Sequence, residues 1–333
     1  MAALVRSAAL THFAELAAAC GLDPRALAAG VGLQPRCLSD PDLKIPAHLV
    51  GRLLETAAAQ AHEPAFGLRL AESRRLSNLG PLALLVRDEP TLRRALEALM
   101  LHIHVHNEAV AVHVAEHAGL VVIRTELTAE GGGSHRQATE LVVGVTFRVL
   151  QIFMGSNWRP RLVCFTHAAP PSLAVHRRVL GPAVEFGHEF NGIVCNAADL
   201  DAPNPGADPV FARYSRKLLQ PTLARSARMS DRVRQLIVLL LPRGLCRVEV
   251  VAQHLGVDRR TVHRKLDAEG TSFSALLDAE RRELAARFVE DSERPLTEVA
   301  AQLGFTAPSA FSRWYKTSFG ASAAQRRAAA GPR

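Results

Sequence analysis

Apolar residues recur at helical spacing through most of the first hundred residues, and short polar or glycine-containing breaks divide this pattern into helices. The predicted helices cover residues 4–20, 24–29, 47–60, 64–72, 80–87 and 90–103. Gly21 is typical of a helix end, because glycine readily adopts the left-handed conformation found there. Asp23-Pro24 is typical of a helix start.

The pattern then becomes mixed. Residues 109–114 and 120–127 predict two strands joined by a turn at Ala118-Gly119, and Gly131-Gly132-Gly133 predicts a flexible break. The elements expected after it are a buried helix over 135–154, strands over 161–166, 183–186 and 190–195, and a short helix over 172–180. Residues 1–200 are therefore expected to form an α+β domain.

Residues 197–209 hold three Pro, three Asp and one Gly, which is typical of a linker or an exposed boundary loop. A helix is expected over 209–224, and we assign 201–228 to a linker and connecting helix. From Ser230 onward the pattern predicts only short helices. Residues 229–330 should thus form a second, all-α domain.

One phrase occurs twice in this second region. Residues 251–256 read VAQHLG and residues 299–304 read VAAQLG, 48 residues apart. Each copy predicts a helix that ends at a glycine and is followed by a second helix. Each second helix carries an apolar pair one turn apart, namely Val262 and Leu266 in the first copy and Phe311 and Tyr315 in the second.

Helix, glycine turn and helix is the helix-turn-helix pattern, which we expect over 248–268, with Asp258 as an N-cap, and over 296–319. With the apolar pairs inside, the outer faces carry donors for guanine edges and phosphates. These are Arg259, Arg260, His263, Arg264 and Lys265 in the first copy, and Ser309, Ser312, Arg313 and Lys316 in the second.

The segment between the two copies predicts a single helix over 273–290. A helix of that length spans about 27 Å, so it could hold two recognition helices roughly one DNA turn, about 34 Å, apart. One chain could then read two successive major grooves. A Leu-Gly turn also occurs in ordinary helix bundles, and Arg-rich faces are often only solvated, so this interpretation rests on the two copies together.

Composition agrees with this division. The 333 residues suit two or three domains, and the net charge of +8 favours an anionic partner. Residues 229–333 contain 17 Lys and Arg against 12 Asp and Glu, so the basic excess is concentrated there. Five scattered Cys are typical of a reducing compartment. No signal-peptide pattern or membrane-length apolar run is present, so we expect a soluble, cytoplasmic protein.

Residues 230–328 resemble the DNA-binding domain of AraC/XylS transcriptional regulators. The resembling stretches are VAQHLGVDRRTVHRKLDAEGTSF, LLDAERRELAARF and LTEVAAQLGFTAPSAFSRWYKTSFG. The resemblance implies base-facing side chains at Arg260, His263, Arg264, Ser309 and Arg313, and leaves Arg259, Lys265, Ser312 and Lys316 for the DNA backbone. Two positions depart from the family. Arg247-Val248 stands where a Ser or Thr N-cap is usual and Ala323 where Pro is usual, and both positions concern helix ends rather than the groove.

The first region is similar to the effector-sensing domain of the subgroup that includes ornithine-responsive regulators. The similar stretches are LTHFAELAAACGLDPRALAAGVGL, LGPLALLVRDEPTLRRALEAL and DLDAPNPGADP. This implies an α+β sensor domain rather than the sugar-binding cupin of the family's founding member. The partners implied are double-stranded promoter DNA, a small-molecule effector, RNA polymerase and a second copy of the chain.

Two alternatives compete with this interpretation. On a strand, His102, His104 and His106 would place three imidazoles on one face, as in a metal site. The chain would then be a metal-binding enzyme or metal sensor with a DNA-binding appendage. The run closes a predicted helix, however, which breaks that geometry, so we expect no metal. The second alternative is an architectural DNA binder without sequence preference.

Four residues are candidates for binding an effector. His135 and Arg136 open a predicted helix, although a solvated helix start is the simpler interpretation, and Trp158 and His167 lie in loops beside a strand. No Ser/His/Asp arrangement, P-loop or GxGxxG fingerprint is present. We therefore expect no catalytic residue, no cofactor and no enzyme activity. The expected function is transcription regulation, by resemblance activation, under the control of a small molecule.

Overall fold

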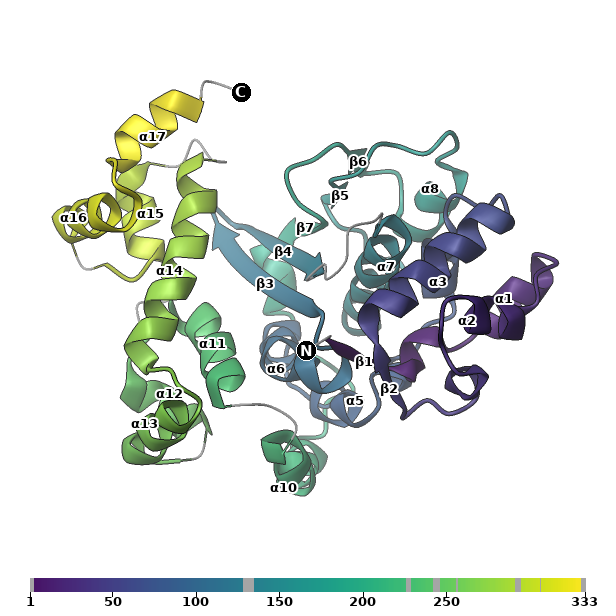
Figure 1. Ribbon diagram of the computed structural model, residues 1–333. Helices are drawn as coiled ribbons and strands as arrows, with labels where there is room; N and C mark the ends of the chain where they lie inside the picture. The colour runs from purple at the N-terminus through teal and green to yellow at the C-terminus, as the bar shows by residue number, and fades with distance from the viewer. Residues whose placement is uncertain are drawn as a thin grey trace. The chain divides into compact units, whose positions relative to one another are not determined.

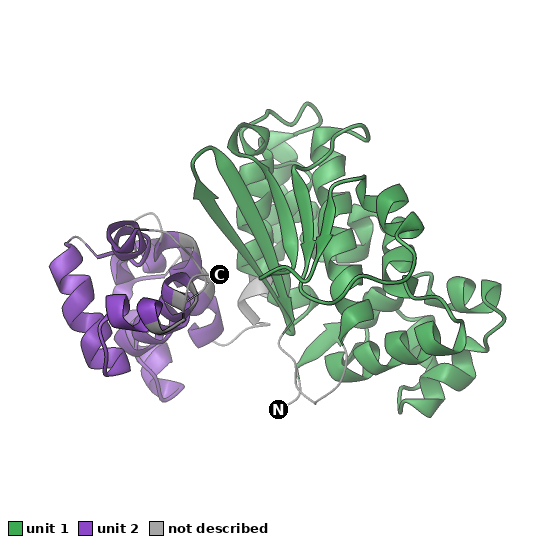
Figure 2. Cartoon of the chain, turned by 90° about the horizontal axis from the view of Figure 1, so that it is seen from above, with its two compact units in different colours: residues 1–226 green, residues 227–333 purple. Residues whose placement is uncertain are grey.

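The computed structural model describes residues 3–127, 135–225, 229–241, 246–255, 257–290, 295–305 and 307–330. The chain forms two compact units, residues 1–226 and 227–333, coloured green and purple in Figure 2. Among the described residues, no helix has the length and apolar character needed to cross a membrane.

The N-terminal unit mixes strands and helices, which confirms the expected α+β domain. Its strands are β1 (Leu4–Arg6), β2 (Lys44–Pro46), β3 (Val110–His117), β4 (Leu120–Leu127), β5 (Leu162–Phe165), β6 (Val184–Phe186) and β7 (Gly192–Asn196). Its helices are α1 (Phe13–Ala19), α2 (Pro24–Gly30), α3 (Ala47–Gln60), α4 (Phe66–Glu72), α5 (Pro81–Val86), α6 (Leu92–His106), α7 (Arg136–Met154), α8 (Ala174–Leu180), α9 (Ala197–Leu200) and α10 (Pro209–Arg225). Short 3-10 helices are η1 (Ser7–Leu10), η2 (Pro35–Leu38) and η3 (Leu76–Leu79).

A five-stranded sheet in the order β3-β4-β7-β5-β6 forms one layer of this unit, and helices cover one of its faces (Figure 2). All neighbouring strands are antiparallel except the parallel pair β5 and β6. The β3–β4 turn is the expected one, with Ala118 and Gly119 at φ of 48° and 78°. The helix-facing side of the sheet is apolar and buried, and includes Val121, Ile123, Val163, Phe165, Ile193 and Cys195.

Two glycines allow α4 and α7 to approach closely. A Cβ on Gly67 would lie 2.0 Å from the carbonyl oxygen of Gln137, and one on Gly144 would lie 2.6 Å from the Cβ of Ala71. The Gln137 side chain also bridges the two helices, because its Oε1 accepts a 2.8 Å hydrogen bond from the Gly67 amide. The start of α7 is therefore fixed against α4.

The first predicted helix is wrong over its N-terminal half. Residues 4–10 form β1 and η1 instead, and α1 begins only at Phe13, after His12 at a φ of 62°. Val5 lies opposite Ile45 in the β1–β2 ladder. Pairing with a distant segment overrides the helical spacing of the apolar residues there. The predicted break at Gly131-Gly132-Gly133 lies outside the described residues.

The proline-rich stretch before α10 packs on the N-terminal unit. The Asn204 side-chain amide donates to the carbonyls of Arg87 (2.9 Å) and Glu89 (3.0 Å). The Arg93 guanidinium pairs with Asp201 at 2.6 Å. The stretch that we assigned to a linker thus begins as a fixed strap on α5 and α6, and α10 follows it.

The C-terminal unit is all-helical, as expected. Its helices are α11 (Met229–Leu240), α12 (Val248–Leu255), α13 (Arg259–Ala268), α14 (Phe273–Glu290), α15 (Leu296–Gln302), α16 (Pro308–Phe319) and α17 (Ala323–Ala330). The predicted helix over 273–290 is confirmed as α14. Figure 1 shows α12 and α13 at one end of α14, and α15 and α16 at the other.

Candidate nucleic-acid interface

The first helix-turn-helix consists of α12 and α13. Asp258 caps α13 as expected, because its carboxylate accepts a 2.7 Å hydrogen bond from the Thr261 amide. Val262 and Leu266 are fully buried. Arg260 and Arg264 lie one helical turn apart on the opposite side of α13, and both are exposed. The helix therefore presents two guanidinium groups directly outward.

The remaining polar residues of α13 flank this outward pair. Lys265 is exposed and His263 is half-buried on the other flank. Arg259 is exposed, but its Nη1 is 3.0 Å from Oε1 of Glu249 on α12. This exposed ion pair is worth little in stability, although it holds the Arg259 side chain along the protein surface.

The second helix-turn-helix consists of α15 and α16. The turn passes through Gly304 at a φ of 71°, which is the left-handed conformation expected of it; Gly256, its counterpart in the first copy, lies outside the described residues. Phe311 and Tyr315 are buried in an aromatic cluster with Phe305, Trp314 and Phe319.

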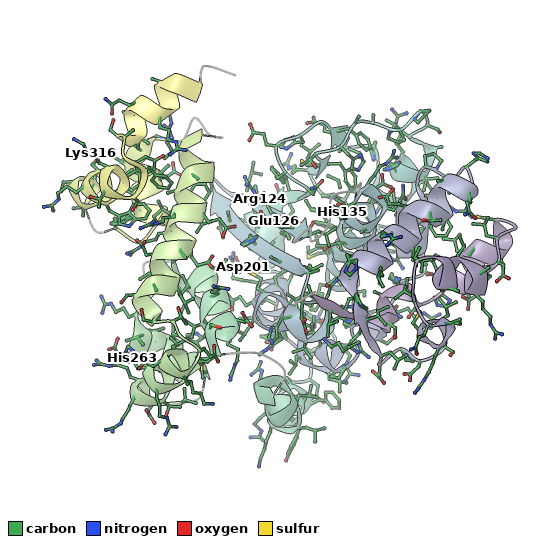
Figure 3. All side chains as sticks on the ribbon, in the orientation of Figure 1. Arg124, Glu126, His135, Asp201, His263 and Lys316 are labelled. Atoms are coloured by element: carbon green, nitrogen blue, oxygen red, sulfur yellow. The ribbon has the colours of Figure 1, made fainter. Side chains whose placement is uncertain are left out.

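The outward face of α16 is less basic than that of α13. It exposes Ser309, Ser312, Arg313 and Lys316. The Ser312 hydroxyl donates a 3.0 Å hydrogen bond to the Pro308 carbonyl within the helix, so its oxygen keeps only acceptor capacity while that bond is made. Figure 3 shows the labelled His263 and Lys316 side chains at opposite ends of α14.

Side chains of α14 hold the second helix-turn-helix in place. Asp278 accepts a 2.7 Å hydrogen bond from the Trp314 indole. Arg281 donates from Nε to the Leu303 carbonyl at 3.0 Å, and its guanidinium lies 4.6 Å from the centre of the Phe305 ring. Burial lowers the pKa of Arg281 from its ordinary value. The turn between α15 and α16 is thus fixed to α14 by the hydrogen bond from Arg281 and by the contact of its guanidinium with the Phe305 ring.

The first helix-turn-helix is tied to α11. Glu269, just after α13, accepts hydrogen bonds from the backbone amides of Met229 (2.6 Å) and Ser230 (2.8 Å). These amides would otherwise be unpaired at the start of α11. Arg234 on α11 is 4.0 Å from Glu280 on α14. Both recognition helices are therefore connected to α14, one directly and one through α11.

The two departures from the family pattern concern helix ends, as expected. Ala323 begins α17, and Ser322 caps that helix, because the Gln325 amide donates to its hydroxyl at 3.2 Å. The Gln325 side chain accepts from the Ser322 amide at 3.0 Å in return. At the other departure, the Arg247 carbonyl accepts from the Val251 amide at the start of α12.

In the N-terminal unit, two of the four candidate effector residues meet around a buried carboxylate. Glu140 on α7 is fully buried, with Arg136 Nε at 3.1 Å, His167 Nε2 at 3.4 Å and His176 Nε2 at 3.2 Å. Burial is the main cause that lowers the pKa of His167. Arg136 and His167 thus belong to one internal cluster with Glu140 and His176.

The other two candidates lie apart from this cluster and from each other. The Trp158 indole donates a 3.0 Å hydrogen bond to Asp199 and lies beside Phe147. His135, labelled in Figure 3, lines a small cavity with His48 and Gly51 of α3. The structure therefore does not gather the four candidates around one common space.

The alternating histidines lie on a helix, so the three imidazoles do not share the one strand face that the metal alternative requires. His102, His104 and His106 all belong to α6, where residues two apart point to opposite sides. His104 is buried, and His106 lies 3.4 Å from the Arg6 guanidinium instead. Within the described part of the chain, no group of three His, Cys, Asp or Glu side chains could hold a metal ion.

The sequence did not indicate several residues that support the helix-turn-helix units and the Glu140 cluster. Asp278, Arg281 and Glu269 hold the two helix-turn-helix units in place through hydrogen bonds, and none of them lies on the outer faces of α13 and α16. Their signal in the sequence is weak, because each is one charged residue among many on a helix. His176, which completes the Glu140 cluster, comes from α8, far from α7 in the chain.

Known proteins match both units. Residues 21–204 match the family described as the arabinose-binding domain of AraC transcription regulator, N-terminal, and residues 251–329 match a helix-turn-helix domain family. The chain is 34% identical over 283 residues to the HTH-type transcriptional regulator VirS of Mycobacterium tuberculosis, covering 84% of this chain and 83% of that protein.

Two further relatives are similar. The ornithine utilization regulator of Pseudomonas aeruginosa is 24% identical over 305 residues, covering 91% of this chain and 90% of that protein. The transcriptional activator NphR of a Rhodococcus species is 34% identical over 137 residues, covering 38% of this chain and 41% of that protein. The family match to the N-terminal unit alone spans more than half of the chain. The chain therefore belongs to the AraC family of DNA-binding transcriptional regulators, whose members regulate transcription rather than catalyse reactions.

Proposed function

We propose that this regulator reads a specific promoter sequence through two successive major grooves, one with α13 and one with α16, under the control of a small molecule bound by the N-terminal unit. The observation that supports the two-groove arrangement is a shared geometry. Each of these helices buries one apolar pair and exposes polar side chains, and the two lie at opposite ends of α14 (Figure 1).

The proposed base contacts are Arg260, His263 and Arg264 on α13, and Ser309 and Arg313 on α16. Exposed guanidinium groups fit this role, because arginine donates two hydrogen bonds to the O6 and N7 atoms of guanine. Three arginine or histidine side chains on α13 favour a guanine-rich half-site. One serine and one arginine on α16 favour a half-site with fewer direct contacts.

The proposed phosphate contacts are Arg259, Lys265, Ser312 and Lys316. Such contacts fix the register of a protein on DNA without selecting a sequence. Removal of one such contact makes the affinity less dependent on salt. Arg259 would have to exchange its present partner, Glu249, for a phosphate. Lys265 and Lys316 are exposed, so they could reach a phosphate without that exchange.

We further propose that the regulator activates transcription, with RNA polymerase and a second copy of the chain as partners. The relative from Rhodococcus is named as a transcriptional activator, and the resemblance of the first region to effector-sensing domains supports a small-molecule signal. Effector binding would shift the population between conformations that differ in promoter affinity.

Selection from a random DNA pool with the full chain, followed by footprinting, tests this function. We expect an enriched sequence with two protected segments about one helical turn apart. Fluorescence anisotropy should then show a preference for that sequence over random DNA of about 10³-fold or more. An enriched pool with no common sequence, or equal affinity for random DNA, would instead identify an architectural DNA binder.

A further inference from the structure

The N-terminal unit contains a cavity of about 120 Å³ between α6, α7, β3, η1 and η3. Its walls are mostly apolar side chains, including Leu96, Leu99, Ile103, Val112, Val145 and Val149. Two of its lining residues, Arg75 and Ile152, are exposed, so the cavity reaches the surface. None of the four effector candidates from the sequence lines it.

This cavity has room for a small organic molecule. A water needs only about 10–15 Å³ of such space, and an apolar cavity of about 150 Å³ in another protein admits benzene. The apolar walls disfavour a sugar, because buried hydroxyl groups without hydrogen-bond partners cost free energy. The space therefore suits an apolar ring or a short hydrocarbon chain.

Besides the exposed Arg75, two less exposed arginines, Arg74 and Arg148, interrupt the apolar lining. Arg74 is only 4% exposed, and its guanidinium donates to the carbonyls of Ala8 (2.8 Å) and Ala9 (2.5 Å). Arg148 on α7 donates to Gln151 at 3.3 Å. The Nε of each arginine is buried without a hydrogen-bond partner. Within the described residues, neither guanidinium lies within ion-pair distance of a carboxylate.

Arg74 differs from the cations Arg6 and Lys44 around it, because they have carboxylate partners and Arg74 has none among the described residues. Arg6 pairs with Asp42, and Lys44 lies 3.6 Å from Glu108, so both neighbouring cations have carboxylate partners. Burial and these cations lower the pKa of His106 to about 3, so that cavity-lining imidazole is neutral near pH 7. Arg74 keeps a positive charge there, because burial lowers its pKa only to about 10. A buried charge without a counter-ion is costly.

We propose that this cavity is the effector site, and that the effector is an apolar monocarboxylic acid whose carboxylate pairs with Arg74, with Arg148 as a second positive group in the same lining. The hydrocarbon part would lie among the leucine and valine side chains. A single anion supplies the partner that Arg74 lacks, and the apolar walls exclude strongly hydrated ligands. The assignment of an effector role rests on the proposed function, whereas the binding itself does not.

Binding can be measured on the full chain without DNA. Isothermal titration calorimetry with octanoate and with benzoate distinguishes a chain from a ring, and octanamide and benzamide are their uncharged controls. We expect one acid to bind at one site per chain, its amide to bind at least about tenfold more weakly, and arabinose to give no heat. Equal affinity for the bound acid and its amide, or no binding of either acid, would overturn the proposal.

Variants locate the site. Arg148→Gln should weaken acid binding about tenfold, since it removes one charge-assisted hydrogen bond, and Val145→Phe should abolish binding by filling the cavity. Arg74→Gln is a weaker test, because Arg74 also holds the Ala8 and Ala9 carbonyls. Arg52→Gln, an exposed residue on α3 away from the cavity lining, is the matched control. If Val145→Phe and Arg148→Gln bind the acid as the wild type does, the acid binds elsewhere and this site is wrong.

Promoter binding separates the two proposals. The DNA affinity of the full chain, measured with and without the acid on the selected sequence, should change by at least about fivefold in the wild type and remain unchanged in Val145→Phe. If the chain binds the selected DNA but not the acid, the proposed promoter recognition stands and the proposed effector site is wrong. If the chain binds the acid but selects no DNA sequence, only the proposed promoter recognition is wrong.

Discussion

The indole nitrogen of Trp314 donates a 2.7 Å hydrogen bond to Oδ1 of Asp278, and this bond joins the second recognition helix to α14. Trp314 also packs on Phe305 and Phe319, so the bond fixes a whole aromatic cluster. Asp278→Ala should therefore destabilise the C-terminal unit by about 1–2 kcal/mol. Urea unfolding of the full chain, followed by tryptophan fluorescence, measures the change.

Arg282→Ala is the control for this variant. Arg282 lies 2.8 Å from the other Asp278 oxygen, but both side chains are well exposed. Loss of such a pair should change stability by no more than about 0.5 kcal/mol. If both substitutions have the same effect, the indole bond does not stabilise the unit.

Arg264→Ala and Arg313→Ala should each weaken binding to the selected DNA by about 1–3 kcal/mol, because each removes a proposed arginine contact to a base. Each should also relax preference at one base position, in different halves of the site. Footprints and affinities with single-base variants of the site measure both effects. Arg52→Ala, an exposed arginine of the N-terminal unit, is the charge-matched control.

Two results would contradict this assignment. Equal losses on the selected and on random DNA would make Arg264 a phosphate contact. Loss of protection over the same bases in both variants would show that α13 and α16 do not read separate grooves.

Gly304→Ala should destabilise the C-terminal unit by about 1–3 kcal/mol, since a side chain strains the left-handed conformation. The φ of Gly304 is 71°, and a Cβ there would lie 2.9 Å from a methyl carbon of Leu241. Thermal unfolding measures the loss. Gly30→Ala at the end of α2 is the control, because Gly30 lacks a positive φ and a Cβ there would meet nothing within 4 Å. A similar loss in both variants would mean that the turn does not require glycine.

The stability of the N-terminal unit should fall as pH drops below about 6.5, in part because of His106. Burial and the charges of Arg6, Arg74 and Lys44 lower the pKa of His106 from 6.5 to about 3. Between these values the unfolded chain binds a proton that the folded chain does not, so acid favours unfolding by up to about 1.4 kcal/mol per pH unit. His106→Gln should reduce the difference in stability between pH 7 and pH 4.5.

His117→Gln, at an exposed position, is the control for this pH effect. The carboxylates of the chain contribute to acid unfolding in every variant. The quantity to compare is therefore the difference in stability between pH 7 and pH 4.5, in the wild type and in each variant. Equal pH dependence in the wild type and in His106→Gln would show that His106 is protonated normally in the folded chain.

Local patterns predicted most of the C-terminal unit. Val262, Leu266, Phe311 and Tyr315 lie at helical spacing around a repeated glycine turn, and all four are buried. The N-terminal end of the chain was predicted less well. Helical spacing over residues 4–12 gives no sign of Ile45, the residue with which Val5 pairs about 40 residues later.

The interior sites could not be predicted for a similar reason. Arg74 and Arg148 look like ordinary charged residues at helix positions, and only the fold brings both to one apolar cavity. The Glu140 cluster likewise joins α7 to residues from the β5–α8 region. Spacing in one helix predicts which residues share a face, but it does not predict which distant segment lies against that face.

The hydrogen bonds from Met229 and Ser230 to Glu269 have a mechanical consequence. The chain enters the described part of the C-terminal unit at Met229, and the first side chain that holds it there comes from the end of the first recognition helix. A displacement of the start of α11 would thus reach the end of α13 through this one carboxylate, and it would reach α14 through the contact of Arg234 with Glu280. The second recognition helix is anchored separately, through Trp314 and Asp278. The two helix-turn-helix units are therefore held by different side chains, and only the first is bonded directly to the start of α11.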